Sequence, residues 1–235
     1  MARILVTGAA SGLGLNTARA LAAAGHEVVV HVRNRSRLQG DDWPGVVHGD
    51  LSDPAQTQDA AEQAQELGPY TAVVHNAGVM QTAQAMAVNV VGSYVLTALI
   101  ERPQRLIYLS SGMHRGGSTD LRRIERGEVS YSDSKLYVTT LSAAFAERWD
   151  GTVSHAVDPG WVPTRMGGAG APDDLTAGHE TQVWLATAEH LRPATGGYWY
   201  HRELQRPHPA TQDPQFQEAL IAALEKRTGI SLPAA

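Results

Sequence analysis

Two residues of this sequence stand at a spacing that suits proton transfer. Tyr131 and Lys135 lie four positions apart in a stretch of helical period, which places the phenol and the ammonium on one helix face. A free tyrosine titrates near pH 10, so exchanging a proton with an alcohol near neutrality needs a pKa lower by roughly 2 to 3. A nearby fixed cation lowers a phenol pKa in this way. The pair predicts acid–base chemistry, although the spacing is also common in helices without function.

A pair of serines strengthens this interpretation. Ser110 and Ser111 follow the predicted strand 105–109. In a doubly wound sheet the carboxyl ends of the strands surround the ligand crevice. A hydroxyl at that edge can donate to a substrate carbonyl oxygen and stabilise its developing charge. Either serine satisfies this requirement by position alone.

A glycine-rich turn predicts a dinucleotide site. Gly8, Gly12 and Gly14, with Ser11 and Leu13 between them, stand where the first predicted strand turns into the first helix. Glycine permits the sharp turn and the close approach of a ligand. The free N–H groups and the positive end of the helix then bind a pyrophosphate. A glycine pattern alone is weak, but the order of strand, turn and helix supports it.

The end of the second predicted strand favours NADP over NAD. NAD-binding folds place a carboxylate there to bind the ribose 2′-hydroxyl, whereas this chain has Arg33 and Asn34. A guanidinium forms forked, charge-assisted bonds with a phosphate. The alternative is that Arg33 is a solvated surface residue.

The pattern of apolar segments predicts the elements that would position these residues. Short apolar runs alternate with segments of helical period, as in βαβ units. The predicted strands are 3–6, 27–32, 45–48, 72–75, 105–109, 152–157 and 197–200, and the predicted helices are 13–24, 55–67, 82–101, 131–149, 179–190 and 214–226. We expect an α/β doubly wound (Rossmann) parallel sheet of seven strands with helices on both faces. It forms a single domain over residues 1–235, with loop 160–178 near the substrate and tail 201–235 packed on the domain.

The bulk composition limits the possible partners. The net charge is −5, so binding to nucleic acid or to an anionic membrane is not expected. No window approaches the roughly 18 consecutive apolar residues of a membrane span. The chain has no cysteine, and His201 and His208 fit no ligand spacing, so we expect no metal. A cytoplasmic location is the expectation.

Together these motifs resemble the short-chain dehydrogenase/reductase family over nearly the whole chain. Further matches are Asp50-Leu51 beside the adenine, Asn76-Ala77-Gly78 after the fourth strand, and the segment from Asp158 to Thr164 after the sixth. The resemblance implies that Ser111 polarises the carbonyl, that Tyr131 exchanges the proton, and that Lys135 holds the nicotinamide ribose and lowers the phenol pKa. It also implies that Asn89 orders a water linked to Lys135. The implied nicotinamide contacts lie in the same segment, at Pro159, Gly160, Val162 and Thr164.

The resemblance chooses Ser111 over Ser110, because the second serine matches the family's catalytic one. His75 replaces the usual first asparagine of its motif, and we expect it to be structural. The long segment 112–130 resembles the branch of retinol dehydrogenases and the WW-domain oxidoreductase. The family often pairs through its two long central helices, but this segment or the tail could block that face, so either a homodimer or a monomer is expected.

The sequence thus predicts an NADP(H)-dependent oxidoreductase that interconverts a small or medium apolar carbonyl compound and its alcohol. The alternative is a sensor or scaffold that binds NADP(H) without turnover. The intact set Asn89, Ser111, Tyr131 and Lys135 argues against that alternative, since binding alone does not require all four. A sugar-nucleotide epimerase is disfavoured by the glycine spacing and the short carboxyl-terminal region.

Overall fold

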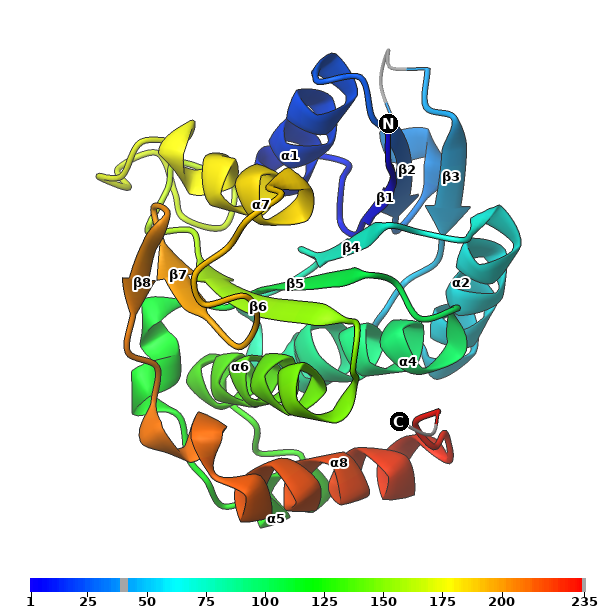
Figure 1. The fold of residues 1–235 in the computed structure, drawn as a ribbon. Helices are drawn as coiled ribbons and strands as arrows, with labels where there is room; N and C mark the ends of the chain where they lie inside the picture. Colours follow the sequence, from blue (N-terminus) through cyan, green and yellow to red (C-terminus); the bar gives the residue numbers. More distant parts are fainter. Residues whose placement is uncertain (39–41, 234–235) are drawn as a thin grey trace.

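A computed structural model describes residues 1–38 and 42–233, so residues 39–41 and 234–235 of the predicted domain lie outside the described residues. One sheet of eight strands, in the order β3-β2-β1-β4-β5-β6-β7-β8, forms its centre (Figure 1). The strands are β1 (Arg3–Val6), β2 (Glu27–Val32), β3 (Gly45–His48), β4 (Ala72–His75), β5 (Arg105–Leu109), β6 (Val153–Asp158), β7 (Tyr198–Tyr200) and β8 (Glu203–Gln205). All neighbours pair in parallel except β7 and β8. The predicted doubly wound α/β sheet is confirmed.

Helices cover both faces of the sheet (Figure 1). Helices α1 (Gly12–Ala23) and α7 (Ala177–Thr187) lie on one face. The other face carries α2 (Pro54–Leu67), α4 (Gly92–Leu99) and α6 (Tyr131–Arg148), with α5 (Arg122–Arg126) and α8 (Pro214–Thr228) outside them. Each face buries its own apolar cluster. The central strands are apolar along their length because both of their faces are covered.

The eighth strand was not predicted. β8 is three residues long and largely exposed, so it carries no apolar alternation that would reveal a strand. The turn before it places His201 and Arg202 at φ of 47° and 63°, in the left-handed region where asparagine and glycine are the usual signals. Histidine and arginine are not typical of such turns, so the sequence did not indicate a hairpin here. The antiparallel edge is therefore an addition to the predicted seven-stranded parallel sheet.

The predicted helix 82–101 is not a uniform helix. It consists of α3 (Thr82–Ala85), a π-helical turn η2 (Met86–Val91) and α4, and it ends at Leu99. The stretch Thr82–Leu99 is the one helical segment in the described part of the chain that is long and apolar enough to cross a membrane, but 67% of it is buried inside the domain. A core helix meets the same criterion.

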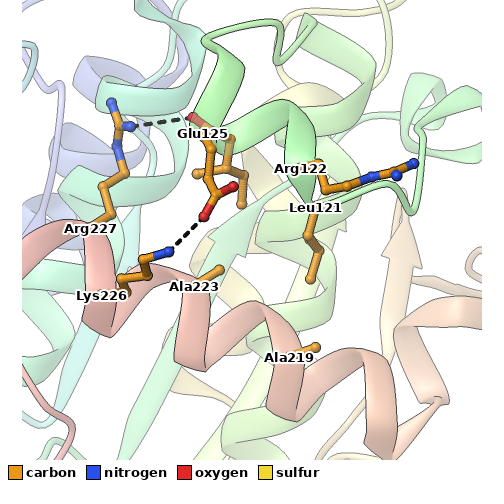
Figure 2. Close-up of a pocket in the computed structure, with 8 residues that line it drawn as sticks. Leu121, Arg122, Glu125, Ala219, Ala223, Lys226 and Arg227 are labelled. Carbon is orange, nitrogen blue, oxygen red and sulfur yellow. Dashed lines mark hydrogen bonds and ion pairs between the residues drawn. The ribbon is translucent and has the colours of Figure 1, made fainter.

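The tail and the segment 112–130 pack together outside α6. Phe216, Leu220 and Leu224 of α8 belong to the same apolar cluster as α6, and the rings of Phe216 and Tyr137 lie 6.3 Å apart. Figure 2 shows the hollow between α5 and α8, where Lys226 forms an ion pair of 2.7 Å with Glu125. The predicted tail helix therefore extends to Thr228 and covers α6.

Candidate active site

The glycine turn is built so that side chains cannot enter it. Gly8 has φ of +67°, and a Cβ there would lie 2.8 Å from the Cα of Ala77. A Cβ on Gly14 would lie 2.3 Å from Nδ2 of Asn76. The turn is tied to the end of β4 because Asn76 Nδ2 donates to the Thr7 carbonyl over 2.8 Å. Bare backbone therefore lines the floor where a pyrophosphate is expected.

A buried histidine that the sequence reasoning missed supports the same turn. His31 lies inside β2, where its Nε2 bonds the Gly49 carbonyl over 3.0 Å and its Nδ1 accepts from the Gly8 N–H over 3.3 Å. Burial lowers the pKa of His31 to about 4, so the ring is neutral as these two bonds require. A histidine within an apolar strand gives no sequence signal of this role.

Two arginines that follow β2 in the sequence line the cleft in which a cofactor is expected. Arg33 and Arg37 both line the cleft, and Arg33 Nε lies 4.0 Å from Oδ2 of Asp50. Asn34 instead accepts from the Ser36 N–H and caps a short helical turn, η1 (Arg35–Arg37), which presents Arg37. Arg37 was missed in the sequence because the turn that orients it lies beyond the strand.

A capping box fixes where α6 begins. Ser130 Oγ accepts from the Asp133 N–H over 3.1 Å, and Asp133 Oδ2 accepts from the Ser130 N–H over 2.9 Å. Asp133 also accepts from the backbone of Ser118 and pairs with Arg123, both in the segment before the helix. Tyr131 is thereby the first residue of α6 and projects from the carboxyl edge of the sheet. The predicted start of the helix at Tyr131 is therefore correct, and the spacing Ser130-x-x-Asp133 is a further sequence signal of this boundary.

Lys135 lies one turn into α6 and points at the end of β5. Its Nζ donates to the Leu109 carbonyl over 2.7 Å and lies 5.6 Å from the centre of the Tyr131 ring. The side chain is buried, and burial lowers the pKa of Lys135 to about 8, while the Asp158 carboxylate opposes this change. The predicted pairing of phenol and ammonium on one face is present.

The expected lowering of the Tyr131 pKa is not found in the structure. Burial raises the pKa of Tyr131, a hydrogen bond with Ser111 lowers it, and the Asp158 carboxylate raises it further. The Lys135 ammonium, which donates to the Leu109 carbonyl, is not among these causes. Desolvation of the phenolate is the largest influence on the Tyr131 pKa.

The two serines have different surroundings. Ser110 is buried and its Oγ lies 2.5 Å from Oγ1 of Thr139. The Ser111 side chain accepts from the Met113 N–H and interacts with the Tyr131 phenol. Of the two, Ser111 has its hydroxyl beside the phenol, whereas Ser110 is the serine that lines the cleft. The role of Ser111 towards a substrate stays a prediction.

Asn89 lies in the π-helical turn η2, a feature that is frequent at functional sites. Its Oδ1 accepts from the Val79 N–H over 2.8 Å, and its Nδ2 donates to the Val79 carbonyl and to Ser134 Oγ. A Cβ on Gly78 would lie 3.4 Å from Asn89 Oδ1 and 3.5 Å from Lys135 Nζ. Asn89 therefore faces Lys135 across Gly78, while the water it would order stays a prediction.

The loop after β6 closes the cleft from the side. Gly160 has φ of +81°, and a Cβ there would lie 2.5 Å from Oδ2 of Asp173. Thr164 lies close to the glycine turn, since a Cβ placed on Gly12 would be 3.5 Å from Cγ2 of Thr164. Val162 is buried against Gly178 instead of facing the cleft. Asp158, just before this loop, was not predicted as a site residue, yet its carboxylate faces Tyr131 and Lys135.

These elements enclose one cleft of about 480 Å³. Its lining includes most of the predicted site residues: Gly8, Ser11, Gly12, Leu13, Gly14, Arg33, Asp50, Leu51, Asn76, Ala77, Gly78, Tyr131, Lys135, Pro159 and Thr164. The predicted residues outside this lining are Asn34, Asn89, Ser111, Gly160 and Val162.

The expectations for His75 and for the tail histidines concern residues that do not line the cleft. His75 ends β4, bonds Thr97 over 2.9 Å and stacks on Tyr108 at 4.6 Å, which agrees with a structural role. His208 Nδ1 accepts from the Ala210 N–H. No group of three or more potential metal ligands gathers within the residues that the structure describes.

The comparisons with known proteins identify the family. The family model for the short chain dehydrogenase matches residues 2–174. The short-chain dehydrogenase chyC of Penicillium rubens is 38% identical over 100% of both chains. A cattle relative, dehydrogenase/reductase SDR family member 13, is 26% identical over 96% of this chain and 73% of its own. The chain belongs to the short-chain dehydrogenase family and is an oxidoreductase.

A solved structure shows the same fold. A short chain dehydrogenase from Shigella flexneri, described as complexed with NADP, has a TM-score of 0.70 at 22% identity, covering 86% of this chain and 97% of its own. The resemblance to the family is confirmed, whereas the narrower branch has only loose support from the cattle relative.

Proposed function

We propose that this protein is an NADP(H)-dependent reductase that interconverts a small or medium apolar carbonyl compound and its alcohol. The observation that carries the proposal is that Tyr131 and Lys135 line a cleft whose floor is the glycine turn, with the Ser111 hydroxyl against the Tyr131 phenol. Binding alone does not require a phenol with a serine on one side and an ammonium on the other.

The cleft fits a nicotinamide dinucleotide. Gly8 and Gly14 leave no room for a side chain on the floor, so a pyrophosphate could approach the backbone N–H groups at the start of α1. Arg33 and Arg37 line the end where the adenosine ribose would lie. Their guanidinium groups suit a 2′-phosphate, which favours NADP over NAD. When bound, the cofactor supplies or accepts the hydride.

The residues of the chain would then handle the proton and the oxygen. Ser111 donates a hydrogen bond to the carbonyl oxygen, and Tyr131 gives its proton to that oxygen as the alcohol forms. Lys135 holds the nicotinamide ribose and supplies positive charge beside the phenol. The phenol carries its proton at neutral pH, as donation to a carbonyl oxygen requires, although its raised pKa makes it a weaker acid than a phenol of lowered pKa.

The mouth of the site supports an apolar substrate. Met80 and Met166, from the loops after β4 and β6, line the cleft and are 46% and 44% exposed. Met113 and Trp161, which do not line it, lie in the loops after β5 and β6 and are 50% and 61% exposed. Methionine side chains adapt to irregular apolar ligands. The indole N–H of Trp161 donates to the Gly167 carbonyl over 2.8 Å, which holds the ring in place.

A panel of aldehydes and ketones assayed by NADPH absorbance tests the function. The wild type should reduce apolar members, and Tyr131→Phe should lower kcat by roughly 1,000-fold while still binding NADPH, since it removes the proton donor alone. NADPH binding measured by fluorescence without turnover of any compound would contradict the proposal and favour a sensor or scaffold.

A further inference from the structure

A buried histidine joins the catalytic serine to the carboxyl-terminal tail. His114 is 0% exposed. Its Nδ1 lies 2.8 Å from the Ser111 carbonyl oxygen, and its Nε2 accepts from the His208 N–H over 2.9 Å. The two bonded residues are far apart in the sequence, and one of them carries the hydroxyl beside Tyr131.

The two partners determine the tautomer of the ring. A backbone N–H can only donate, so Nε2 must carry the lone pair, and the proton must lie on Nδ1, where it is donated to the Ser111 carbonyl. A protonated ring would direct a second donor at the His208 N–H. Burial lowers the pKa of His114, which keeps the ring neutral.

Further contacts hold this ring from both sides. His114 packs on Tyr198 of β7 with ring centres 4.6 Å apart, and the Tyr198 hydroxyl donates to Asp158 Oδ2 over 3.2 Å. The neighbouring Arg115 donates to the Arg206 carbonyl in the tail over 2.9 Å. The charged and titratable groups facing His114 are thus Arg115, Asp158, His208 and Tyr198.

We propose that His114 is a positioning residue through which tail residues 206–208 fix the Ser111 hydroxyl against Tyr131. This inference rests on the proposed function. The Ser111 carbonyl accepts both the His114 backbone N–H over 3.0 Å and the His114 ring N–H. Two donors on one carbonyl fix the backbone that carries the reacting hydroxyl. Displacements near 1 Å at a reacting group can lower rates by roughly 100-fold.

Replacing His208 by proline tests this link, because proline lacks the backbone N–H that bonds His114 Nε2. His208 has φ of −59°, so proline fits its backbone and deletes the N–H donor. His208→Pro also removes the side chain, which accepts from the Ala210 N–H. His208→Ala is the matched control, because it loses that side-chain bond and keeps the backbone donor.

We expect His208→Pro to lower kcat roughly 10-fold relative to His208→Ala, with the KM for NADPH unchanged in both. A second readout is independent of turnover: ¹⁵N NMR of the His114 ring should show the Nδ1–H tautomer in the wild type. The pKa of His114 should rise in His208→Pro, because the bond to neutral Nε2 is gone.

Equal kcat in the two His208 variants, or an Nε2–H ring in the wild type, would overturn the inference. His114→Phe provides a second test, since it keeps a ring against Tyr198 and removes both polar contacts; it should lower kcat by at least as much as His208→Pro. If the wild type turns over no carbonyl, the proposed function fails, while the tautomer and the rise in pKa still decide whether the tail and the Ser111 turn are linked.

Discussion

The Ser110 hydroxyl donates a hydrogen bond to Oγ1 of Thr139. The two oxygens lie 2.5 Å apart, and the Thr139 hydroxyl donates to the Lys135 carbonyl over 2.7 Å. Because each hydroxyl has one proton, Thr139 can only accept from Ser110. Ser110 lines the cleft, but its hydroxyl proton is taken up by the bond to Thr139, so the Ser111 hydroxyl beside Tyr131 is the better candidate to meet a substrate oxygen.

This relationship predicts opposite results for the two alanine variants. Ser111→Ala should lower kcat by roughly 100-fold, because it removes a donor to the developing oxyanion. Ser110→Ala should keep kcat near the wild-type value and reduce the free energy of unfolding by about 1 kcal/mol. Steady-state kinetics and urea unfolding separate the two effects. Loss of kcat in Ser110→Ala alone would reverse the assignment.

Cofactor preference depends on the two cleft arginines. Arg33→Asp should lower the ratio of kcat/KM for NADPH to that for NADH by roughly 100-fold, because a carboxylate repels the 2′-phosphate and can bind a 2′-hydroxyl. Arg37→Ala should lower the ratio by less. Arg19→Ala, outside the cleft lining, is the control. An unchanged ratio in Arg33→Asp would remove Arg33 from the cofactor site.

The alkaline limit of activity should depend on Lys135 and Asp158. Lys135 has a pKa of about 8 and is protonated below it, so kcat/KM should fall as the pH rises through that value. The Asp158 carboxylate raises the pKa of both Lys135 and Tyr131. Asp158→Asn should therefore move the alkaline limb to lower pH. Asp173→Asn should leave it in place, and an unmoved limb in Asp158→Asn would contradict the assignment.

Buried histidines should make the fold sensitive to acid. Burial lowers the pKa of His31 and of His155 from 6.5 to about 4. Above pH 6.5 both rings are neutral in the folded and unfolded chains, so the full stability is present. As the pH falls towards 4 the unfolded chain binds protons first, which costs about 2 kcal/mol for each ring at pH 5.

Urea unfolding at pH 7 and pH 5 measures this loss. His155→Gln should reduce the difference between the two pH values, and the exposed His190→Ala should not. Equal stability at both pH values in the wild type would show that these rings are already protonated in the folded chain at pH 5.

The packing of the tail helix α8 on α6 predicts that the protein is a monomer. Family members often pair through the helices that correspond to α4 and α6, and here α8 packs on α6 through Phe216, Leu220 and Leu224. Pairing through that face would displace α8 from the apolar cluster. Light scattering at micromolar concentration should therefore give the mass of one chain. A dimer with a cross-link on α6 would show that the tail moves aside.

The sequence determined the order of most strands and helices along the chain, the glycine turn and the candidate catalytic side chains. These follow from local periodicity and from residue types at fixed spacing, as for Tyr131 and Lys135 or for Gly8 and Gly14. The hairpin at His201 and Arg202 escaped because its turn uses residues that do not signal one.

Tertiary structure alone decided which groups meet across long sequence separations. Ser110 and Ser111 differ only in what surrounds them, and the pKa of Tyr131 depends on burial that no spacing reveals. The roles of His31, Asp158 and His114 likewise arise from contacts between distant segments. Desolvation and hydrogen-bond partners are properties of the packed molecule, so these relationships exist only once the chain has folded.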